Sequence, residues 1–338
     1  MKKRKAAAVL AACLLALQGC ASTAESDEPA PRPTGVRMKA EVAWPEERLE
    51  KNEDGIPLLR VYVVDEEKVE TMDLETYVEG VLAGEMKNNW PEEALKAQAI
   101  LARTFVLKFV DEKKSKYPDA DISTDIEEAQ AYDRNAVNDS IRQAVADTRG
   151  IVLSAEGQLP YAWFHAHSGG TTERAVAGLG WKEAEPAYTA VVKGNEPETV
   201  EDEKDQQLLK DARKWQATFP AEEFEEACRS LGAEVTINGN VRLSVGERGE
   251  GGRAKTIVVD GKSLPAADLR IALGSTKMRS TLLTSLKVQD GQVVMEGSGY
   301  GHGVGMSQWG AYGMAQQGSS AREIVEHYFT GVITEKLW

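Results

Sequence analysis

Cysteine is scarce in this chain. Its 338 residues include three cysteines, and two of them, Cys13 and Cys20, lie within the first twenty positions. Cys228 stands alone in the rest of the chain, so a framework of intrachain disulfides is excluded. The length is sufficient for one large domain or two of ordinary size, and a substantial hydrophobic core is possible.

An excess of positive charge is also absent. The chain has 40 Lys and Arg residues against 54 Asp and Glu residues, which gives a formal net charge of −14. Proteins that bind nucleic acid or anionic lipid surfaces do so through basic patches. The charge balance argues against both partners and suits a neutral or cationic polymer better.

The apolar run near the N-terminus, residues 6–17, is too short to span a bilayer easily. It follows the basic residues 2–5 and leads into Leu17-Gln18-Gly19-Cys20, where a small residue before cysteine resembles the bacterial lipobox. We therefore expect a lipoprotein signal peptide over residues 1–19 and lipidation of Cys20. The protein would then be anchored on the outer face of the cytoplasmic membrane. The alternative is an ordinary signal peptide or short anchor with an incidental cysteine.

Composition predicts the division of the rest of the chain. Residues 20–37 are expected to form a solvated tether, because residues 21–35 are rich in Ala, Pro, Ser and Thr and lack periodic apolar positions. Charged stretches and short strand-like pieces then set residues 195–274 apart as an inserted α/β subdomain. The flanking segments 38–194 and 275–338 would form the two parts of a catalytic core.

Apolar periodicity predicts a mixture of strands and helices. Alternation over residues 59–63 predicts a strand, and the spacing over residues 74–85 predicts a helix. Pro91 opens a second helix through residue 110, with acids in its first turn where the helix dipole favours them. Strands and helices do not alternate as regular βαβ units, and no internal repeat is present, so the predicted class is α+β.

One acid, Glu85, falls on the apolar side of the helix predicted over residues 74–85. On a helical wheel it lies with Leu74, Val78, Val81 and Leu82. Burial and the negative end of the helix dipole both favour the protonated form of such a carboxyl, so it could donate a proton near neutral pH. The alternative is an ordinary glutamate that extends from a frayed helix end into solvent.

The stretch "GSGYGHGVGMSQWGAYGMA", residues 297–315, has glycine at every second position from 297 to 305, around His302. Glycines leave the main-chain amides and the imidazole open to close approach by a ligand. The spacing does not fit a dinucleotide-binding loop. The alternative is a flexible hairpin with a chance histidine.

Polar residues elsewhere extend the candidate site. Gln98 and Arg103 border the apolar stripe of the second predicted helix, where they would either line a groove or decorate the surface. In "FHAHSGGTT", residues 164–172, a polar turn of Ser168, Gly169, Gly170 and Thr171 follows an aromatic strand and offers hydroxyls and amides to a substrate.

Two more specific interpretations of the same stretch, a zinc site and a serine nucleophile, have less support in the sequence. His165 and His167 would project from one face of the strand and, with His302, could form a three-histidine zinc site, but no cysteine or carboxylate is obviously supplied to complete it. Ser168 could be a nucleophile, but the strand–turn–helix setting of G-x-S-x-G is absent. We therefore expect neither a bound metal nor another cofactor.

Three ordered stretches resemble the signature blocks of the stage II sporulation protein D family. They are residues 77–107, residues 164–176 and residues 297–318, within a similarity that runs from about Leu59 to the C-terminus and is weakest over 195–270. The resemblance implies a bacterial envelope protein, a lytic transglycosylase that acts on peptidoglycan glycan strands. It also implies that strands stripped of stem peptides are preferred, and therefore a partner amidase.

The resemblance also implies residue roles. The catalytic acid of the family falls on Glu85 and its helix arginine on Arg103. The residues that it places at the cleft are Ser168, Gly169, Gly170, Thr171, Tyr188, His302, Gly303, Ser307 and Gln308. Ala190 replaces the basic residue expected two positions after Tyr188. Some members bind zinc near the serine–glycine turn with cysteine as well as histidine, and this chain has no cysteine there.

Ordinary glycosidases use two carboxylates, whereas only one acid is convincingly placed here. A lytic transglycosylase needs one, because the C6 hydroxyl of the muramic acid attacks and leaves a 1,6-anhydro end. We expect Glu85 to act as acid and then as base, with Arg103 and His302 positioning the sugar or stabilising charge.

The second candidate function is a non-catalytic wall-binding enhancer of an N-acetylmuramoyl-L-alanine amidase, and a metal-dependent hydrolase ranks third. The sporulation protein that gives the family its name is usually held by a transmembrane helix, whereas this chain is expected to be lipidated, so the resemblance leaves both a sporulation role and a vegetative wall-remodelling role open.

Overall fold

The computed structural model describes residues 42–338. The predicted signal peptide, Cys20 and the tether therefore lie outside the described residues. Within residues 42–338, helices α1–α9 accompany strands β1–β13, which form five small sheets, so the α+β class is confirmed. No helix in this part of the chain is both long and apolar enough to cross a membrane.

Two helices lie at the centre of the first hydrophobic core. α1 spans Leu74–Glu85 and α2 spans Glu92–Glu112, in agreement with the two predicted helices. Asp73 caps α1 by accepting the main-chain N–H of Thr76. Most of α2 is buried on all sides, which requires neighbours around its whole circumference.

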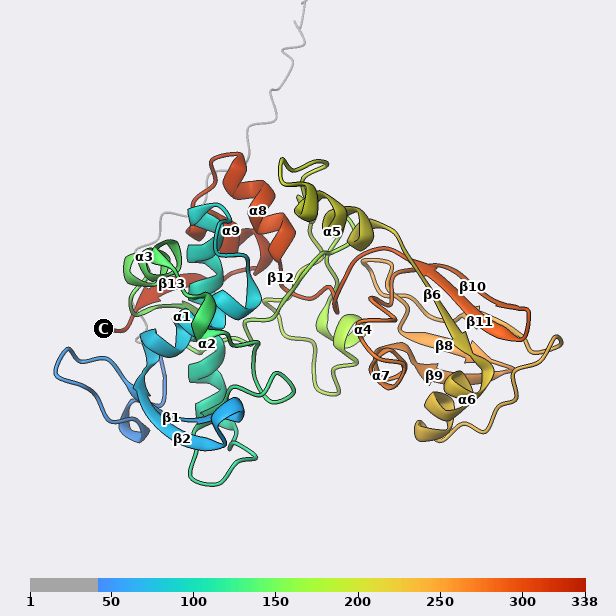
Figure 1. Ribbon diagram of the computed structural model, residues 1–338, viewed down its shortest axis with the longest axis horizontal. Coiled ribbons are helices and arrows are strands. Elements are labelled where there is room, and N and C mark those ends of the chain that lie inside the picture. Colours follow the sequence, from blue (N-terminus) through green and yellow to red (C-terminus); the bar gives the residue numbers. More distant parts are fainter. Residues whose placement is uncertain (1–41) are drawn as a thin grey trace, which may run out of the picture. The chain divides into compact units, whose positions relative to one another are not determined.

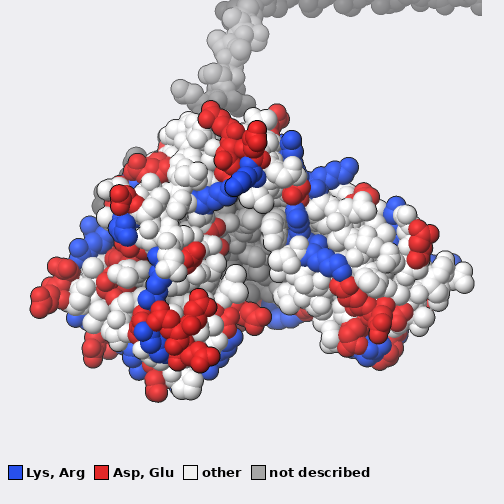
Figure 2. All heavy atoms as spheres, viewed as in Figure 1, with Lys and Arg blue, Asp and Glu red and all other residues white. Residues whose placement is uncertain are grey.

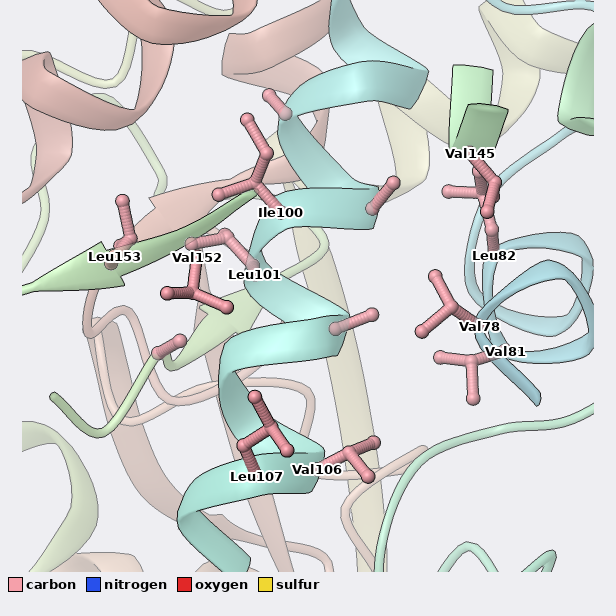
Figure 3. Close-up of a cluster of buried hydrophobic side chains, with 14 of the residues drawn as sticks. Val78, Val81, Leu82, Ile100, Leu101, Val106, Leu107, Val145, Val152 and Leu153 are labelled. Carbon is pink, nitrogen blue, oxygen red and sulfur yellow. The ribbon is translucent and has the colours of Figure 1, made fainter. Parts of the chain in front are cut away.

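Neighbouring helices and strands cover α2 on all sides. Figure 3 shows side chains of α1, such as Val78, on one side of α2, and those of β4, such as Val152, on another. Around α2 lie α3 (Asp139–Asp147), α8 (Gln308–Gln316), α9 (Ala321–Tyr328) and β4 (Ile151–Ser154). Ser320 and Glu323, whose spacing in the sequence is that of a capping box, form one at the start of α9. Segments far apart in the sequence thus meet around one helix (Figure 1).

Short sheets complete the first core. β1 (Leu58–Val63) pairs antiparallel with β2 (Lys68–Asp73) and parallel with β3 (Ile122–Ser123), while β4 pairs antiparallel with β13 (Ile333–Lys336). The aromatic strand predicted near residue 164 is two residues long; it is β5 (Phe164–His165), which pairs in parallel with β12 (Met306–Ser307). This pairing joins the second and third signature blocks. The 3-10 helices are η1 (Glu46–Arg48), η2 (Val64–Glu66) and η3 (Arg134–Ala136).

A second hydrophobic core gathers buried residues between Trp215 and Met295. Its elements are β6 (Trp215–Pro220), α6 (Ala221–Ser230), β7 (Leu243–Val245), β8 (Thr256–Val259), β9 (Lys262–Pro265), α7 (Ala266–Ala272), β10 (Leu283–Gln289) and β11 (Gln292–Gly297). β11 pairs with β6, with Val293 opposite Phe219, so the predicted boundary at residue 274 falls inside this core. α4 (Ala175–Leu179) and α5 (Glu203–Arg213) precede it.

On the face shown in Figure 2, acidic and basic side chains are interspersed, and acidic side chains form the larger groups. No broad basic patch lies on that face. This distribution agrees with the negative net charge of the chain.

Candidate functional site

Glu85 is the last residue of α1, because the chain turns to an extended conformation at Met86. Glu85 is half-buried, and Oε1 of its carboxyl accepts the main-chain N–H of Ala131 at 2.7 Å. The acid is therefore held from outside its own helix.

Two glycines of α1 make this contact possible. A Cβ atom at Gly84 would lie 2.6 Å from the main-chain nitrogen of Tyr132, and one at Gly80 would lie 2.2 Å from the Tyr132 ring. Residues four apart share one face of a helix, so these glycines give α1 a flat strip on which residues 131–133 rest. Asp133 donates its main-chain N–H to the carbonyl of Gly80 at 2.9 Å and fixes the same loop.

The pKa of the Glu85 carboxyl is raised above its ordinary value. Burial is the largest cause, and the hydrogen bonds from Ala131 and Gln308 oppose it without cancelling it. A carboxyl with a raised pKa keeps its proton to higher pH, as a general acid requires.

The side-chain amide of Gln308 connects Glu85 to Gln98 on a third helix. Gln308, the first residue of α8, donates from Nε2 to the main-chain carbonyl of Glu85 at 3.2 Å and to Oε1 of Gln98 on α2 at 3.5 Å. Both glutamines are buried, and Nε2 of Gln98 has no partner in the described part of the protein. The structure thus brings three of the predicted site residues together from α1, α2 and α8.

A depression of about 470 Å³ opens beside this group. Its lining consists of residues 83–89 and Ala136, and Glu85 lies in the middle of that run. The volume falls in the range of small-molecule pockets, about 300–1,000 Å³.

The serine–glycine turn is built differently from the prediction. Gly169 and Gly170 have φ values of 84° and 110°, which side chains rarely adopt. Ser168 is fully buried, and its Oγ accepts the main-chain N–H of Gly170 at 3.0 Å. Its hydroxyl therefore stabilises the turn itself, and is not presented to a ligand. Thr171 is half-buried and forms a bridge with Lys193.

The main chain of Ser168 is held by charged groups at both ends. Its N–H donates to Oε1 of Glu196 at 2.7 Å, and its carbonyl accepts from Nη2 of Arg253 at 2.8 Å. Arg253 is fully buried, and burial lowers its pKa to about 10. Gly303 lies against this guanidinium, because a Cβ atom there would be 1.9 Å from its Nε.

The surroundings of His302 favour the neutral form of its imidazole. Its Nδ1 accepts the main-chain N–H of Val304 at 3.1 Å, and burial together with two nearby arginines lowers its pKa to about 3. The His302 ring centroid lies 5.7 Å from that of His165, whose Nδ1 donates to the carbonyl of Val304 at 3.1 Å. Among residues 42–338, no group of three or more His, Cys, Asp and Glu side chains is arranged to hold a metal ion.

Arg103 does not contact Glu85. It is fully buried in an ion pair with Glu75, with Nη2 2.5 Å from Oε2, and its Nη1 donates to the carbonyl of Ile151 at 2.9 Å. All three guanidinium nitrogens have protein partners. The expected contact between Arg103 and a substrate is thus not supported by the geometry, because this ion pair occupies the side chain.

Tyr188 is also engaged within the protein. Its hydroxyl accepts the main-chain N–H of Tyr161 at 2.9 Å, and burial raises its pKa to about 12. The ring packs against the first core. No hydrogen bond in the described part of the chain joins Tyr188 to the residues around Glu85.

Glu196 and Arg253 were not predicted as site residues. Glu196 begins a strongly charged stretch that suggests a solvated surface, and Arg253 lies in the segment least like the family. The glycine-rich stretch around residues 246–252 was a local signal that the chain approaches another segment closely: a Cβ atom at Gly251 would lie 2.1 Å from the carbonyl oxygen of Thr172.

Comparison with known proteins identifies relatives of this chain. A family model described as Stage II sporulation protein matches residues 63–154, and a model of a domain of unknown function matches residues 192–305. Stage II sporulation protein D of Bacillus amyloliquefaciens is 34% identical over 285 residues, covering 80% of this chain and 77% of that protein. The protein of the same name from Bacillus subtilis (strain 168) is 33% identical over 286 residues, with the same coverage of 80% and 77%. The Amidase enhancer of Bacillus subtilis is 29% identical over 293 residues, covering 75% of this chain and 39% of that protein.

Proposed function

Because this chain belongs to the stage II sporulation protein D family, we propose that it is a lytic transglycosylase that cleaves peptidoglycan glycan strands between MurNAc and GlcNAc. The proposal rests on the environment of the Glu85 carboxyl. This carboxyl has a raised pKa, lies in an open depression and accepts the main-chain N–H of Ala131, while Gln308 donates to the main-chain carbonyl of the same residue.

In the first half of the reaction, Glu85 gives its proton to the glycosidic oxygen while the bond from that oxygen to C1 breaks. The C6 hydroxyl of the same muramic acid then forms a bond to C1, and its proton passes to the Glu85 carboxylate. The products are a 1,6-anhydro end and a free hydroxyl on the departing sugar, and no water is consumed. A raised pKa suits both halves, since the group must first hold and then regain a proton.

Neither of the expected helpers supplies positive charge at this site. Arg103 is paired with Glu75, and the pKa of His302, about 3, leaves its ring neutral at physiological pH. An oxocarbenium-like centre is itself positive, so the Glu85 carboxylate and the negative end of the α1 dipole are the charges that stabilise it. In this proposal Gln98 and Gln308 orient the sugar.

The setting of the reaction is proposed as well. Lipidation of Cys20 would place the enzyme on the outer face of the cytoplasmic membrane, next to its polymeric substrate. Strands stripped of stem peptides are the preferred substrate, so a peptidoglycan amidase would act before it. The family relationship favours a role in wall remodelling during sporulation.

Digestion of purified denuded glycan tests the activity. Wild-type protein should produce anhydro-MurNAc ends detectable by mass spectrometry, and Glu85→Gln should lose them while it still folds and binds glycan. An active Glu85→Gln variant would reject the mechanism. Unchanged activity in the presence of chelators is expected, and a loss would favour a metal-dependent hydrolase.

The similarity to the Amidase enhancer supports a second candidate, a non-catalytic protein that binds the wall and stimulates an amidase. This function needs the same depression but not the acid. Glu85→Gln should then stimulate a purified amidase as well as the wild type does, while neither protein produces anhydro ends.

A further inference from the structure

Glu196 lies where the second and third signature blocks meet, although it belongs to neither block. Its side chain is 5% exposed, and Oε1 accepts the main-chain N–H of Ser168 at 2.7 Å and the hydroxyl of Ser307 at 2.8 Å. The same oxygen lies 3.7 Å from Nδ1 of His167. A single carboxylate oxygen thus connects the serine–glycine turn to the start of α8.

The charged form of Glu196 is the stable one. Burial alone would raise its pKa, but the hydrogen bonds from Ser168 and Ser307 outweigh burial and lower it. A buried carboxylate that accepts several hydrogen bonds loses much of its stabilisation when its partners move, so it fixes their positions.

The contact with Ser307 reaches the candidate site directly. Ser307 caps α8, since its Oγ accepts the main-chain N–H of Gly310 at 3.2 Å while its own proton goes to Glu196. Gln308 is the next residue, and its amide donates to the carbonyl of Glu85. Any shift in the first turn of α8 therefore moves Gln308 relative to Glu85.

The backbone just before Glu196 is packed against the same helix. A Cβ atom at Gly310 would lie 1.9 Å from the carbonyl oxygen of Gly194, and one at Gly313 would lie 2.2 Å from that of Asn195. Glycines three apart on one face of α8 thus admit the segment that carries Glu196. Gly194 also accepts a hydrogen bond from the hydroxyl of Tyr328 at 2.5 Å, which anchors the segment to α9.

From these contacts we propose that Glu196 is a positioning residue, which holds the serine–glycine turn and the first turn of α8 in register so that Gln308 faces Glu85. The effect on cleavage rests on the proposed function, whereas the effect on the position of Gln308 does not.

Glu196→Gln tests the proposal, because it keeps the size of the side chain and removes its charge. A displacement of about 1 Å in a catalytic site costs on the order of 100-fold in rate, so we expect kcat/KM for denuded glycan to fall on the order of 10- to 100-fold, mainly through kcat. Glu198→Gln is the matched control, since Glu198 lies two residues away and is exposed.

Two further readouts separate positioning from a general loss of stability. In amide hydrogen exchange, the N–H groups of Ser168 and Gly310 should exchange at least tenfold faster in Glu196→Gln, while those in the middle of α2 stay unchanged. In NMR spectra the side-chain amide of Gln308 should shift. Adding Ser307→Ala to Glu196→Gln should cost less than the sum of the two single changes, because the two residues share one contact.

The outcomes are distinguishable. If Glu196→Gln matches Glu198→Gln in exchange, in the Gln308 shift and in cleavage, the positioning role is rejected. If the wild type makes no anhydro ends, the proposed function fails, while the exchange and the Gln308 shift still decide the role of Glu196.

Discussion

Ala131 donates its main-chain N–H to Oε1 of Glu85 at 2.7 Å, although the two residues are 46 positions apart in the chain. The contact exists because Gly84 has no side chain and the loop can lie directly on α1. One oxygen of the acid is thus fixed by a rigid main-chain group, which limits the rotation of the carboxyl during proton transfer.

Gly84→Ala should separate this loop from the acid. The added Cβ atom would meet main-chain atoms at 2.6 Å, so the loop must shift. Overpacking costs about 1–3 kcal/mol and outweighs the gain of about 1 kcal/mol in helix propensity, so we expect lower stability in urea and slower cleavage. Gly239→Ala is the control, because a Cβ atom there has no neighbour within 4 Å. Equal stability of the two variants would contradict the close approach.

The Arg103–Glu75 ion pair should stabilise the fold and not the transition state. Arg103→Met leaves a buried carboxylate without its guanidinium, which costs about 3–5 kcal/mol of unfolding free energy. Replacing both partners, as Arg103→Met with Glu75→Gln, should recover most of this loss, because no uncompensated charge remains.

Cleavage by that double variant decides between the two roles of Arg103. A structural role predicts that the folded double variant cleaves glycan at nearly the wild-type rate. Restored stability without activity would instead return Arg103 to the substrate, as the family resemblance implies. Arg322→Met, which breaks an exposed ion pair with Glu326, should change stability by less than about 1 kcal/mol.

Local patterns were sufficient to predict much of the fold. The helices at 74–85 and 92–112 and the capping box of α9 each depend on residues within a few positions of one another. The inward placement of Glu85 follows from the same helical spacing. Of the short strand-like pieces expected within residues 195–274, the one at residues 233–239 does not form a strand, which shows how weak short apolar alternation is as evidence.

Local patterns could not predict which residues contact the site residues. Ala131, Glu196 and Arg253 act through contacts with residues 28 to 85 positions away, and no periodicity encodes such pairs. The position of Arg103 beside an apolar stripe left two interpretations open, a residue that lines a groove and one that decorates the surface. Its buried partner, Glu75, fits neither, because the pair satisfies the charge inside the protein.

His302 should make the protein sensitive to acid. Its pKa is about 3 in the folded state, against an ordinary value of 6.5, so between these values the unfolded chain binds more protons than the folded one. Stability contributed by this residue therefore falls as pH drops from 6.5 toward 3, with a limiting slope of about 1.4 kcal/mol per pH unit. NMR titration should show a neutral His302 ring from pH 8 to 5, and His302→Gln should flatten the loss of stability in acid. A ring that becomes protonated near pH 6.5 would contradict the burial.

Glu85 should show the opposite dependence. Its pKa is raised above the ordinary 4.5, so in the window above 4.5 the folded state binds more protons than the unfolded chain, and stability falls as pH rises through the raised pKa. Glu85→Gln removes this loss. Its unfolding free energy relative to the wild type should therefore increase from below pH 4.5 to neutral pH, as measured by urea unfolding at each pH.

Glu323→Gln is the contrasting control, because hydrogen bonds from Ser320 lower the pKa of Glu323. This variant should lose stability relative to the wild type as the pH rises through its own, lower window. The same trend in both variants would mean that Glu85 is not held in a desolvated site, and the acid that the proposed reaction needs would be missing.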